Sequence, residues 1–449
     1  MKRWRQLRRH VLRTRRSSQG LARPSVQVSD LPLDSHLATA LGMPAAKDME
    51  KAQRAHIVAL VIHGGAGGTT TPDMPADLLE AYRNRLRSVL TTTYAAEHAS
   101  SLDAVCHAVE QLEDSPLFNA GKGAVFDLAG NTVCECSLMT TQPHLNSNTV
   151  AVTGVERTKN PIALARVLME KNKELGGHAF YSGEAAEQAG WKYGTKQVGK
   201  RYYWTKRRWN EHKRGLDKIQ QGGSKHECCL DGEEDEDLPA YSQDAADKME
   251  EHEDQAVFDR YANMSDFLPQ GTVGAVALDS NGHLSVATST GGKTNKFPGR
   301  IGDTPSVGSG FLADSWTSTA LHRHQRSWLV RVVQRVLLRA PPAGKAGKEQ
   351  GVAISGTGDG DFFLRTCFAS SIADRIRFAN VPVEQAIKAA MAEIVGLYGK
   401  PKGVGGAIVL DGDGNAYFPV AAATMNRGLI SKHTGFRPRI AIFDHEKLA

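Results

Sequence analysis

The chain has 449 residues, of which 41% are hydrophobic, and it carries a formal net charge of +6. This hydrophobic content is sufficient for a large core, and the excess positive charge lies at the N-terminus and in internal segments, so it is weak support for nucleic-acid binding. Six cysteines in so long a chain exclude a small disulfide-bonded scaffold, and no apolar run is long enough for a transmembrane helix.

The N-terminal segment is rich in arginine. Residues 1–29 contain no Asp or Glu, and Trp4, Leu7 and Val11 fall at helical spacing among the Arg and Lys residues. This pattern is typical of a mitochondrial transit peptide, but a basic tail or a wrongly chosen start codon explains it equally well. We treat residues 1–55 as a tail outside the fold and expect a cytoplasmic protein, with a mitochondrial location as the alternative.

Organised sequence begins with HIVALVIHGGAGG at 56–68, which predicts a buried strand that ends in glycines. Helical periodicity follows over 77–98 and 101–113, and the apolar residues of the second helix fall on one face. After PLFNAGKGAVFD at 116–127, short strands are expected, and a further helix is predicted from Pro161.

Residues between about 195 and 267 differ in composition from the rest. KRYYWTKRRWNEHKR (200–214) is basic and aromatic, whereas GEEDEDLPAYSQDAADKMEEHEDQ (232–255) is acidic. Aromatic side chains between Lys and Arg suit stacking on a nucleic acid. A solvated helix, with its charge offset by the acidic run, explains them more simply. We therefore predict a flexible acidic linker over about 215–267 and expect no nucleic-acid partner.

Compact sequence resumes at residue 272. A basic, acid-free segment over 322–348 includes SWLVRVVQRVLLR, which suits an amphipathic helix for a membrane surface or a partner protein. An inserted surface helix or a gene-model error fits the segment as well, and no membrane partner is expected. The other elements predicted here are strands at 273–279, 283–289 and 351–356, helices near 361–378 and 382–398, and a final hairpin.

Two patterns hint at a metal without matching a metal site. Cys134-Glu-Cys136 and a later Cys-Cys pair lack the C-x-x-C spacing of zinc ligands, so we expect reduced thiols. LDGDGNAYF (410–418) resembles the start of a calcium loop, but Ala422 stands where the bidentate glutamate is required. No catalytic metal is therefore predicted.

The pair Gly271-Thr272 precedes a predicted strand that needs neither residue. A threonine hydroxyl becomes an effective nucleophile beside a base, and an N-terminal threonine carries its own α-amine, with a pKa of about 7.7–8.0. Cleavage of the Gly271–Thr272 bond would expose that amine. Glycine permits the strained geometry in which the hydroxyl attacks the preceding carbonyl, and the linker lets the new C-terminus leave.

Three motifs together resemble the plant-type asparaginase/isoaspartyl peptidase family of N-terminal-nucleophile hydrolases. They are GTVGAVALD (271–279), TSTGGKTNKFPGRIGDTP (288–305) and SGTGDGDFFLR (355–365). VIHGGAGG, PLFNAGKGAVFD and KGVGGAIVLDGDGN are similar to other parts of the family. The resemblance implies an α+β fold, a four-layer αββα sandwich cleaved into an α chain (56–271) and a β chain (272–449) that remain one domain.

The resemblance also implies roles for individual catalytic residues. Thr272 matches the nucleophile and N-terminal base, and Thr290 matches the threonine whose hydroxyl holds and helps to activate it. Ser355 and Gly356 stand at the positions that we assign to the oxyanion hole, as a hydroxyl and a backbone N–H. Asn119 matches an asparagine near the nucleophile.

The substrate-binding residues are implied in the same way. Arg300 and Asp303 match the pair that binds the α-carboxylate and the α-amine of the substrate, and Gly358 matches a glycine whose backbone faces that amine. The expected substrate is L-asparagine or a β-aspartyl dipeptide. The resemblance further implies a structural sodium ion bound by carbonyls of the 112–122 loop, no other cofactor, and a homodimer of αβ units.

Some departures from the family pattern leave rival functions open. VCECSLMTT (133–141) and VAAATMNRG (420–428) differ from the usual motifs, and the 322–348 segment enlarges a connection. A glycosylasparaginase would more usually have STNG where this chain has STGG (289–292). A taspase-like endopeptidase would usually lack the acid at Asp303. A non-catalytic binding protein of the same fold is the alternative outside the enzymes.

Overall fold

A computed structural model describes residues 56–70, 74–143, 147–221, 253–264, 271–317 and 349–448. The predictions for the N-terminal tail, for most of the acidic run and for the basic 322–348 segment fall on residues outside these ranges. The described part is α+β, with two β-sheets and helices from both halves of the chain.

The larger sheet has eight strands in the order β13-β12-β1-β5-β6-β2-β3-β4, and only the pair β3–β4 is parallel. Strand β1 precedes Thr272 in the sequence but lies between β12 and β5, which both follow Thr272. The strands are β1 (Ile57–Gly67), β2 (Cys134–Thr140), β3 (Thr149–Val155), β4 (Phe180–Ser182), β5 (Val273–Asp279), β6 (Leu284–Thr290), β12 (Thr424–Ser431) and β13 (Arg439–Phe443).

The smaller sheet has five strands, in the order β10-β9-β8-β7, with β11 paired to β9. Its strands are β7 (Phe311–Thr317), β8 (Glu349–Gly358), β9 (Gly405–Asp411), β10 (Ala416–Tyr417) and β11 (Val420–Ala421). Both β7 and β9 pair antiparallel with β8, so β8 is a central strand, and it carries the SGTGDG motif toward its C-terminal end.

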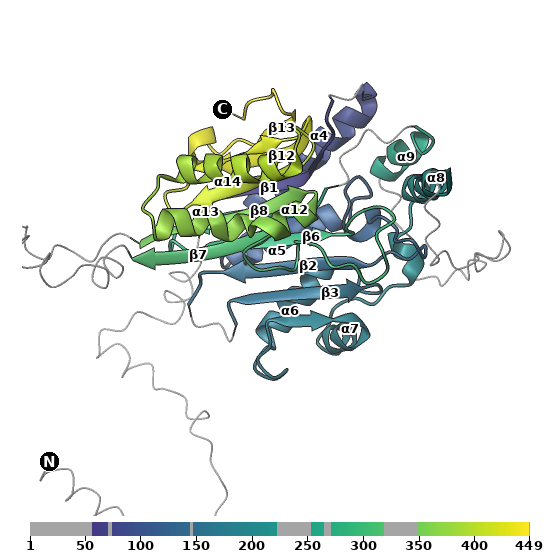
Figure 1. Cartoon of the computed structure of the whole chain (residues 1–449). Coiled ribbons are helices and arrows are strands. Elements are labelled where there is room, and N and C mark those ends of the chain that lie inside the picture. Colours follow the sequence, from purple (N-terminus) through teal and green to yellow (C-terminus); the bar gives the residue numbers. More distant parts are fainter. Residues whose placement is uncertain are drawn as a thin grey trace, which may run out of the picture. The chain divides into compact units, whose positions relative to one another are not determined.

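Helices lie on the outer faces of both sheets. In Figure 1, α13 and α14 lie in front of the strands, and α5 lies behind them. No helix in the described ranges is both long and apolar enough to span a membrane. The helices are α4 (Ala76–Ala95), α5 (Ser101–Glu113), α6 (Pro161–Glu170), α7 (Gly183–Lys192), α8 (Lys206–Gln221), α9 (Glu253–Arg260), α12 (Gly360–Thr366), α13 (Phe368–Arg377) and α14 (Val383–Tyr398), with short 3₁₀ turns η2 (Gly121–Gly123), η3 (Lys200–Tyr203) and η4 (Lys432–Thr434).

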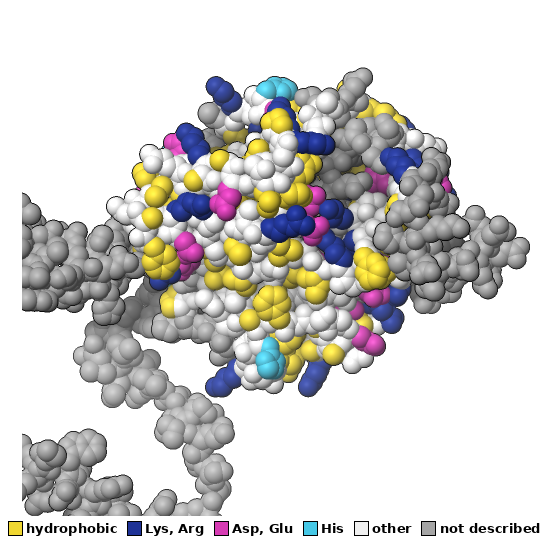
Figure 2. Space-filling model, in the orientation of Figure 1, with side chains coloured by type: hydrophobic (Ala, Val, Ile, Leu, Met, Phe, Trp, Pro, Cys, Tyr) yellow, Lys and Arg dark blue, Asp and Glu magenta, His cyan; other side chains and the backbone are white. Residues whose placement is uncertain are grey.

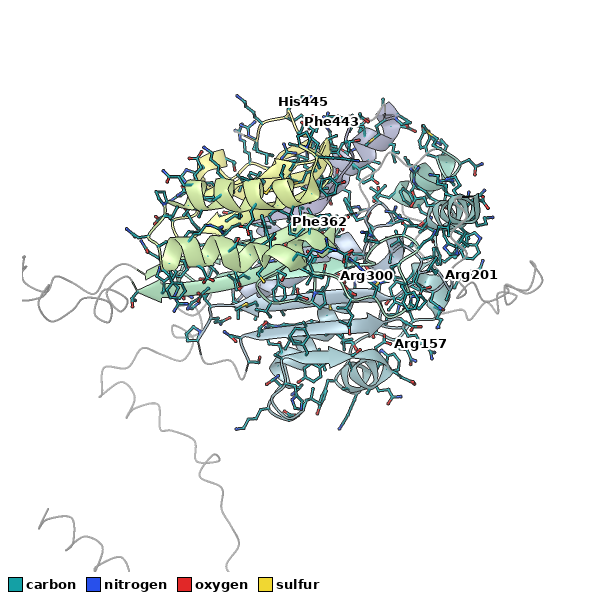
Figure 3. All side chains as sticks on the ribbon, in the orientation of Figure 1. Arg157, Arg201, Arg300, Phe362, Phe443 and His445 are labelled. Carbon is teal, nitrogen blue, oxygen red and sulfur yellow. The ribbon has the colours of Figure 1, made fainter. Side chains whose placement is uncertain are left out.

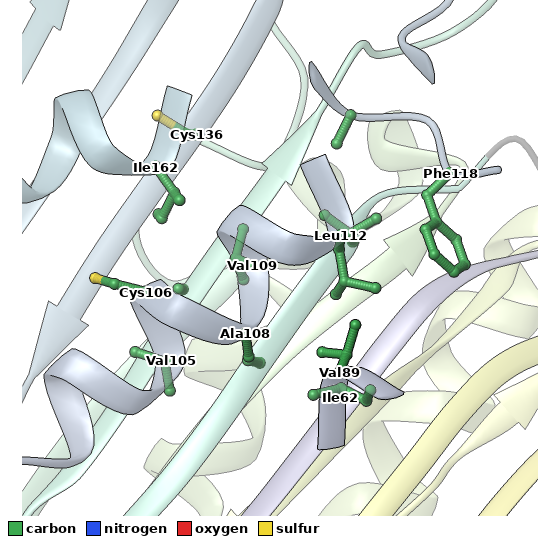
Figure 4. Close-up of a cluster of buried hydrophobic side chains, with 14 of the residues drawn as sticks. Ile62, Val89, Val105, Cys106, Ala108, Val109, Leu112, Phe118, Cys136 and Ile162 are labelled. Carbon is green, nitrogen blue, oxygen red and sulfur yellow. The ribbon is translucent and has the colours of Figure 1, made fainter. Parts of the chain in front are cut away.

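Helix α5 shows how the sequence pattern builds the core. Val105, Ala108, Val109 and Leu112 recur at helical spacing, are fully buried, and pack with side chains from β1 and β2 (Figure 4). The hydroxyl of Ser100 accepts a hydrogen bond from the backbone N–H of the third helical residue and so caps the helix N-terminus. The predicted helix and its apolar face are therefore confirmed.

Three hydrophobic clusters follow the layers of the fold. One joins the large sheet to α4, α5 and α6, and a second joins the small sheet to α12, α13 and α14. The third lies between the two sheets and includes Val61 on β1, Val276 on β5, Val286 on β6 and Ile408 on β9. Strands of both sheets are consequently buried on two faces, which explains their nearly continuous apolar runs.

The predicted flexible linker over 215–267 is wrong for the parts that the structure describes. Helix α8 continues to Gln221, and α9 begins at Glu253. Helix α8 is not a solvated helix either, because Arg207 and Arg208 are fully buried and both bond to Glu211. Phe258 of α9 is buried against the two guanidinium groups. Pairing with Glu211 and contacts with Phe258 and backbone carbonyls, rather than solvation, accommodate this charge.

Candidate active site

Thr272 and Thr290 lie side by side at one end of the large sheet. Strands β5 and β6 pair antiparallel with Val273 opposite Ser289, so the residue before β5 and the last residue of β6 lie at the same edge. Thr272 is 5% exposed, and its Oγ1 lies 3.4 Å from Oγ1 of Thr304. The hydroxyl of Thr290 accepts a hydrogen bond from the backbone N–H of Gly292.

A small polar pocket opens beside these two threonines. It brings together residues from four separate stretches of the chain, and its walls carry two cations and two acids. The lining residues are Glu135, Thr272, Thr290, Gly292, Lys293, Arg300, Gly302, Asp303, Gly358 and Gly360. Five of the predicted site residues therefore meet in one pocket, namely Thr272, Thr290, Arg300, Asp303 and Gly358.

Gly271 fits its surroundings only as a glycine. A Cβ on this residue would lie 2.4 Å from both the backbone N of Ala66 and Oγ1 of Thr357. Gly65 has a φ of +111°, a conformation that glycine adopts readily, and its backbone lies directly against Gly271. The glycine-rich loop at the end of β1 thus surrounds the peptide bond that precedes Thr272.

Thr357 contacts the candidate nucleophile, although the sequence analysis did not select it. Its hydroxyl donates a hydrogen bond of 3.1 Å to the backbone carbonyl of Thr272 and accepts one of 3.2 Å from the N–H of Ala66. The next residue, Gly358, lines the pocket and has a φ of +137°.

The structure does not bring Ser355 and Gly356 to the pocket. Ser355 is fully buried, with its Oγ 2.7 Å from Nε2 of His63 and 2.9 Å from Oγ1 of Thr288. Burial lowers the pKa of His63 to about 3, so this imidazole is neutral. The N–H of Gly356 donates to the carbonyl of Gly310. The two residues assigned to the oxyanion hole from the sequence therefore do not line the pocket that contains Thr272.

Arg300 and Asp303 lie in the same pocket but have different surroundings. Arg300, which is labelled in Figure 3, lines the pocket, and its Nη2 lies 3.0 Å from Oδ1 of Asp361. Asp303 is 6% exposed, and burial raises its pKa to about 7. A Cβ on Gly360 would lie 2.1 Å from Oδ1 of Asp303, so the carboxyl group needs a glycine opposite it.

Asn119 connects two loops rather than lining the pocket. Its Nδ2 donates to the carbonyl of Gly292 at 2.7 Å, and its Oδ1 accepts from the N–H of Val125 at 3.0 Å. Its own backbone carbonyl accepts from the N–H of Gly291. Asn119 therefore fixes the turn that follows Thr290 against the 116–127 loop.

Glu135 lines the pocket and was also missed by the sequence analysis. It lies opposite Thr290 in the β2–β6 pair, and its carboxylate accepts from the N–H of Gly302 at 3.1 Å. Its neighbours Cys134 and Cys136 point the other way, into the hydrophobic core, as free thiols. Strand alternation around the two cysteines was the signal that could have identified Glu135 as a site residue.

The 112–122 loop has features that fit a bound alkali cation. A Cβ on Gly121 would lie 2.5 Å from the carbonyl oxygen of Glu113. A Cβ on Gly123 would lie 2.1 Å from the carbonyl oxygen of Phe118 and 2.5 Å from the carbonyl oxygen of Pro116. Hard cations take oxygen ligands of this kind. Backbone oxygens of Glu113, Pro116 and Phe118 therefore lie close to these two glycines.

A glycine–threonine pair before a buried strand, with hydroxyls and an arginine–aspartate pair in one pocket, defines a candidate hydrolase with an N-terminal threonine nucleophile. The family described as Asparaginase matches residues 56–320 and 338–437, which include every residue that lines the pocket. The chain belongs to this family, whose members are N-terminal-nucleophile hydrolases.

Individual relatives agree with the family assignment. The chain is 30% identical to the isoaspartyl peptidase of Escherichia coli (strain K12) over 377 residues, which cover 82% of this chain and 91% of the relative. It is 31% identical to the isoaspartyl peptidase/L-asparaginase of Homo sapiens over 258 residues, which cover 57% of this chain and 67% of the relative. It is 32% identical to the protein of the same name in Danio rerio over 261 residues, which cover 57% of this chain and 66% of the relative.

Proposed function

We propose that this protein is a threonine amidohydrolase that cleaves itself between Gly271 and Thr272 and then hydrolyses L-asparagine or β-aspartyl peptides. The observation that carries the proposal is the pocket in which Thr272 meets Thr290, Arg300 and Asp303. The names of the relatives, isoaspartyl peptidase and L-asparaginase, support the same substrate class.

The first reaction is cleavage of the precursor. Oγ of Thr272 adds to the carbonyl carbon of Gly271, the C–N bond breaks, and the hydroxyl proton passes to the released amine. Water then hydrolyses the resulting ester, which leaves a carboxylate on Gly271 and a free α-amine on Thr272. The close packing of Gly65 and Ala66 around Gly271 supports this step, because it restricts the movement of the scissile peptide bond.

The new amine serves as the base for the second reaction. Its pKa of about 7.7–8.0 suits removal of the hydroxyl proton near neutral pH. Oγ of Thr272 then attacks the side-chain carbonyl of asparagine or the isopeptide carbonyl of a β-aspartyl peptide. Ammonia or an amino acid leaves with the proton, and water hydrolyses the β-aspartyl ester. The hydroxyl of Thr304 lies 3.4 Å from Oγ1 of Thr272, and Thr290 lines the same pocket, so both threonines are placed to orient the nucleophile.

Substrate orientation comes from the charged walls of the pocket. Arg300 binds the α-carboxylate, because a guanidinium group pairs with a carboxylate through two parallel hydrogen bonds. Asp303 accepts from the α-ammonium group. For the oxyanion we propose the hydroxyl of Thr357 and the N–H of Gly358, in place of Ser355 and Gly356, because Thr357 already bonds to the residue that performs the attack.

Two structural features complete the proposal. The two facing sheets and their outer helices suit the four-layer αββα sandwich of N-terminal-nucleophile hydrolases. The backbone carbonyls of Glu113, Pro116 and Phe118 would hold a structural sodium ion and so stiffen the loop that carries Asn119.

Mass spectrometry with N-terminal sequencing tests the proposal directly. The purified protein is expected to give two chains, one of which begins at Thr272, and the Thr272→Ala variant is expected to stay uncut. The mature protein is expected to release ammonia from L-asparagine or leucine from β-aspartyl-leucine. A single uncut chain without either activity would refute the proposal.

A further inference from the structure

Four charged side chains form a chain of ion pairs at the mouth of the pocket. Nζ of Lys293 lies 3.0 Å from Oδ1 of Asp359 and 3.4 Å from Oδ2 of Asp361. The other carboxylate oxygen of Asp361 lies 3.0 Å from Nη2 of Arg300. Asp361 is thus shared by two cations, and both of these cations line the pocket that contains Thr272.

The ion pair between Arg300 and Asp361 conflicts with the role proposed for Arg300. A guanidinium group that binds the α-carboxylate of the substrate has to give up part of its contact with Asp361. Burial alone would raise the pKa of Asp361, but the hydrogen bond from Arg300 and the charges of Arg300 and Lys293 outweigh it and lower the pKa. Asp361 therefore stays ionised, and an incoming carboxylate meets a like charge.

We propose that Lys293 is a positioning residue that retains Asp361 while Arg300 turns to the substrate carboxylate. The inference rests on the proposed function, because it assumes that Arg300 binds that carboxylate. In the empty site, two cations face the two carboxylates of Asp359 and Asp361. A bound substrate adds a third carboxylate. Without Lys293, the carboxylates of Asp359, Asp361 and the substrate would compete for Arg300 alone, because the α-ammonium group of the substrate is paired with Asp303, and binding would weaken.

The surroundings of Lys293 suit this task. Its side chain is 46% exposed and already contacts both acids, so it can shift toward Asp361 without leaving a buried partner unpaired. Lys296, three residues later, cannot replace it. Nζ of Lys296 is committed to the backbone carbonyls of Val133 and Gly291 beneath the pocket.

Charged side chains of both signs are interspersed on the visible face of the described part. In the space-filling view, Lys and Arg side chains lie among Asp, Glu and hydrophobic side chains on the described part of the visible face (Figure 2). Exposed charges at longer range are screened by salt, so the nearest charges decide whether a carboxylate enters. This places the control of substrate binding on Lys293 and Asp361 themselves.

A double-mutant cycle tests the inference through binding of L-aspartate to the mature protein, measured by isothermal titration calorimetry. The Lys293→Met variant is expected to weaken binding about fivefold, the size of one partly exposed ion pair, with kcat for asparagine unchanged. In the Asp361→Asn background, the same substitution is expected to change Kd by less than about twofold, because the charge that Lys293 offsets is gone.

Two outcomes would overturn the inference. The first is a Kd that Lys293→Met leaves unchanged. The second is an equal weakening of binding in the wild-type and Asp361→Asn backgrounds, which would mean that Lys293 acts independently of Asp361. The Lys388→Met variant is the matched control, because Lys388 forms an exposed ion pair with Glu384 on α14. Binding of L-aspartate without turnover of asparagine or β-aspartyl-leucine would refute the proposed function but would leave the cycle measurable.

Discussion

Two hydroxyl side chains on β8, Thr357 and Ser355, have different neighbours and therefore different expected roles. Thr357 bonds to the carbonyl of Thr272, whereas Ser355 bonds to His63 and Thr288 inside the protein. The first can act on the reaction directly. The second can act only through the packing beneath the site.

Alanine substitutions at these two positions should separate the roles. Thr357→Ala is expected to lower kcat about 10²–10³-fold, the usual loss for one oxyanion donor, with KM little changed. Ser355→Ala is expected to leave the pocket intact and to lower the free energy of unfolding by about 1–3 kcal/mol, because two buried polar groups lose their partner. Steady-state kinetics and denaturant unfolding of both variants measure this. A larger loss of kcat in Ser355→Ala than in Thr357→Ala would support the assignment of Ser355 to the oxyanion hole that was made from the sequence.

Asp303 should make substrate affinity depend on pH. Burial raises its pKa to about 7, the charge of Arg300 lowers it, and the charges of Glu135 and Asp361 raise it. Below pH 7 the carboxyl group of the empty site is protonated, so KM for asparagine is expected to rise as pH falls through 7. In Asp303→Asn, KM should be high at every pH and lose this dependence.

The same pKa shift has the opposite consequence for stability. The folded state binds the proton of Asp303 more tightly than the unfolded state does, because the ordinary pKa of an aspartate is 3.8. Stability from this group is therefore present below that value and is lost as pH rises through 7. Asp303→Asn is expected to unfold at a higher temperature than the wild type above pH 7, and an equal or lower temperature would contradict a raised pKa.

At the scale of elements, α8 and α9 depend on one buried carboxylate. Oε1 of Glu211 accepts from Nε of Arg207 at 3.1 Å, and Oε2 accepts from Nη1 of Arg208 at 2.8 Å, with all three side chains at most 1% exposed. Arg208 also donates through Nε to the carbonyl of Gly123, which directly follows the predicted sodium loop. The helix is thereby fixed to a loop that supports the site.

Removal of the Glu211 carboxylate should show how much its ion pairs with the two arginines contribute to the free energy of unfolding. Glu211→Ala is expected to lower the free energy of unfolding by about 3–5 kcal/mol, because it leaves buried guanidinium charge uncompensated. Denaturant unfolding of the uncut Thr272→Ala protein measures this on a single chain. Glu184→Ala is the control, since Glu184 is exposed and accepts a hydrogen bond from exposed Gln188, and its loss should cost less than about 0.5 kcal/mol. Equal losses would mean that the arginines are solvated.

The regular elements were largely predictable from the sequence, and the exceptions have physical causes. The strand 273–279 and the helix 101–113 have the predicted bounds, because their apolar residues follow a clear period. The predicted helical stretch 361–378 is instead divided into two helices at Cys367, which has a φ of 45°. The periodicity of the apolar residues does not indicate this break. Helix α8 was misjudged because local composition cannot show that Glu211 pairs with two neighbouring arginines inside the protein.

The residues of the candidate site were predictable wherever a motif could be aligned with the family pattern in only one way. Arg300 and Asp303 occur once in their motif and both line the pocket. The SGTGDG stretch repeats glycine at every second position, so Ser355-Gly356 and Thr357-Gly358 present similar pairs. Only the spatial relation to Thr272 distinguishes them.

At the scale of the whole molecule, the proposed cleavage would divide a sheet whose strands are interleaved. Strand β1, from before Thr272, lies between β12 and β5, and β2, also from before it, pairs with β6. The Gly271–Thr272 bond lies at the end of β5, outside these pairings. Cutting it removes one covalent link but no strand pair and no part of the three hydrophobic clusters.

The two chains should therefore stay together after cleavage. The mature protein is expected to elute as one species in size-exclusion chromatography, with both chains in every fraction, and to separate only in denaturant. Because β1 cannot leave without breaking the ladders on both of its edges, loss of one chain requires unfolding of the large sheet. Elution of a folded β chain alone would contradict the interleaved sheet. If the cut protein elutes at the same volume as the uncut Thr272→Ala control, the sheet, rather than the Gly271–Thr272 bond, holds the two chains together.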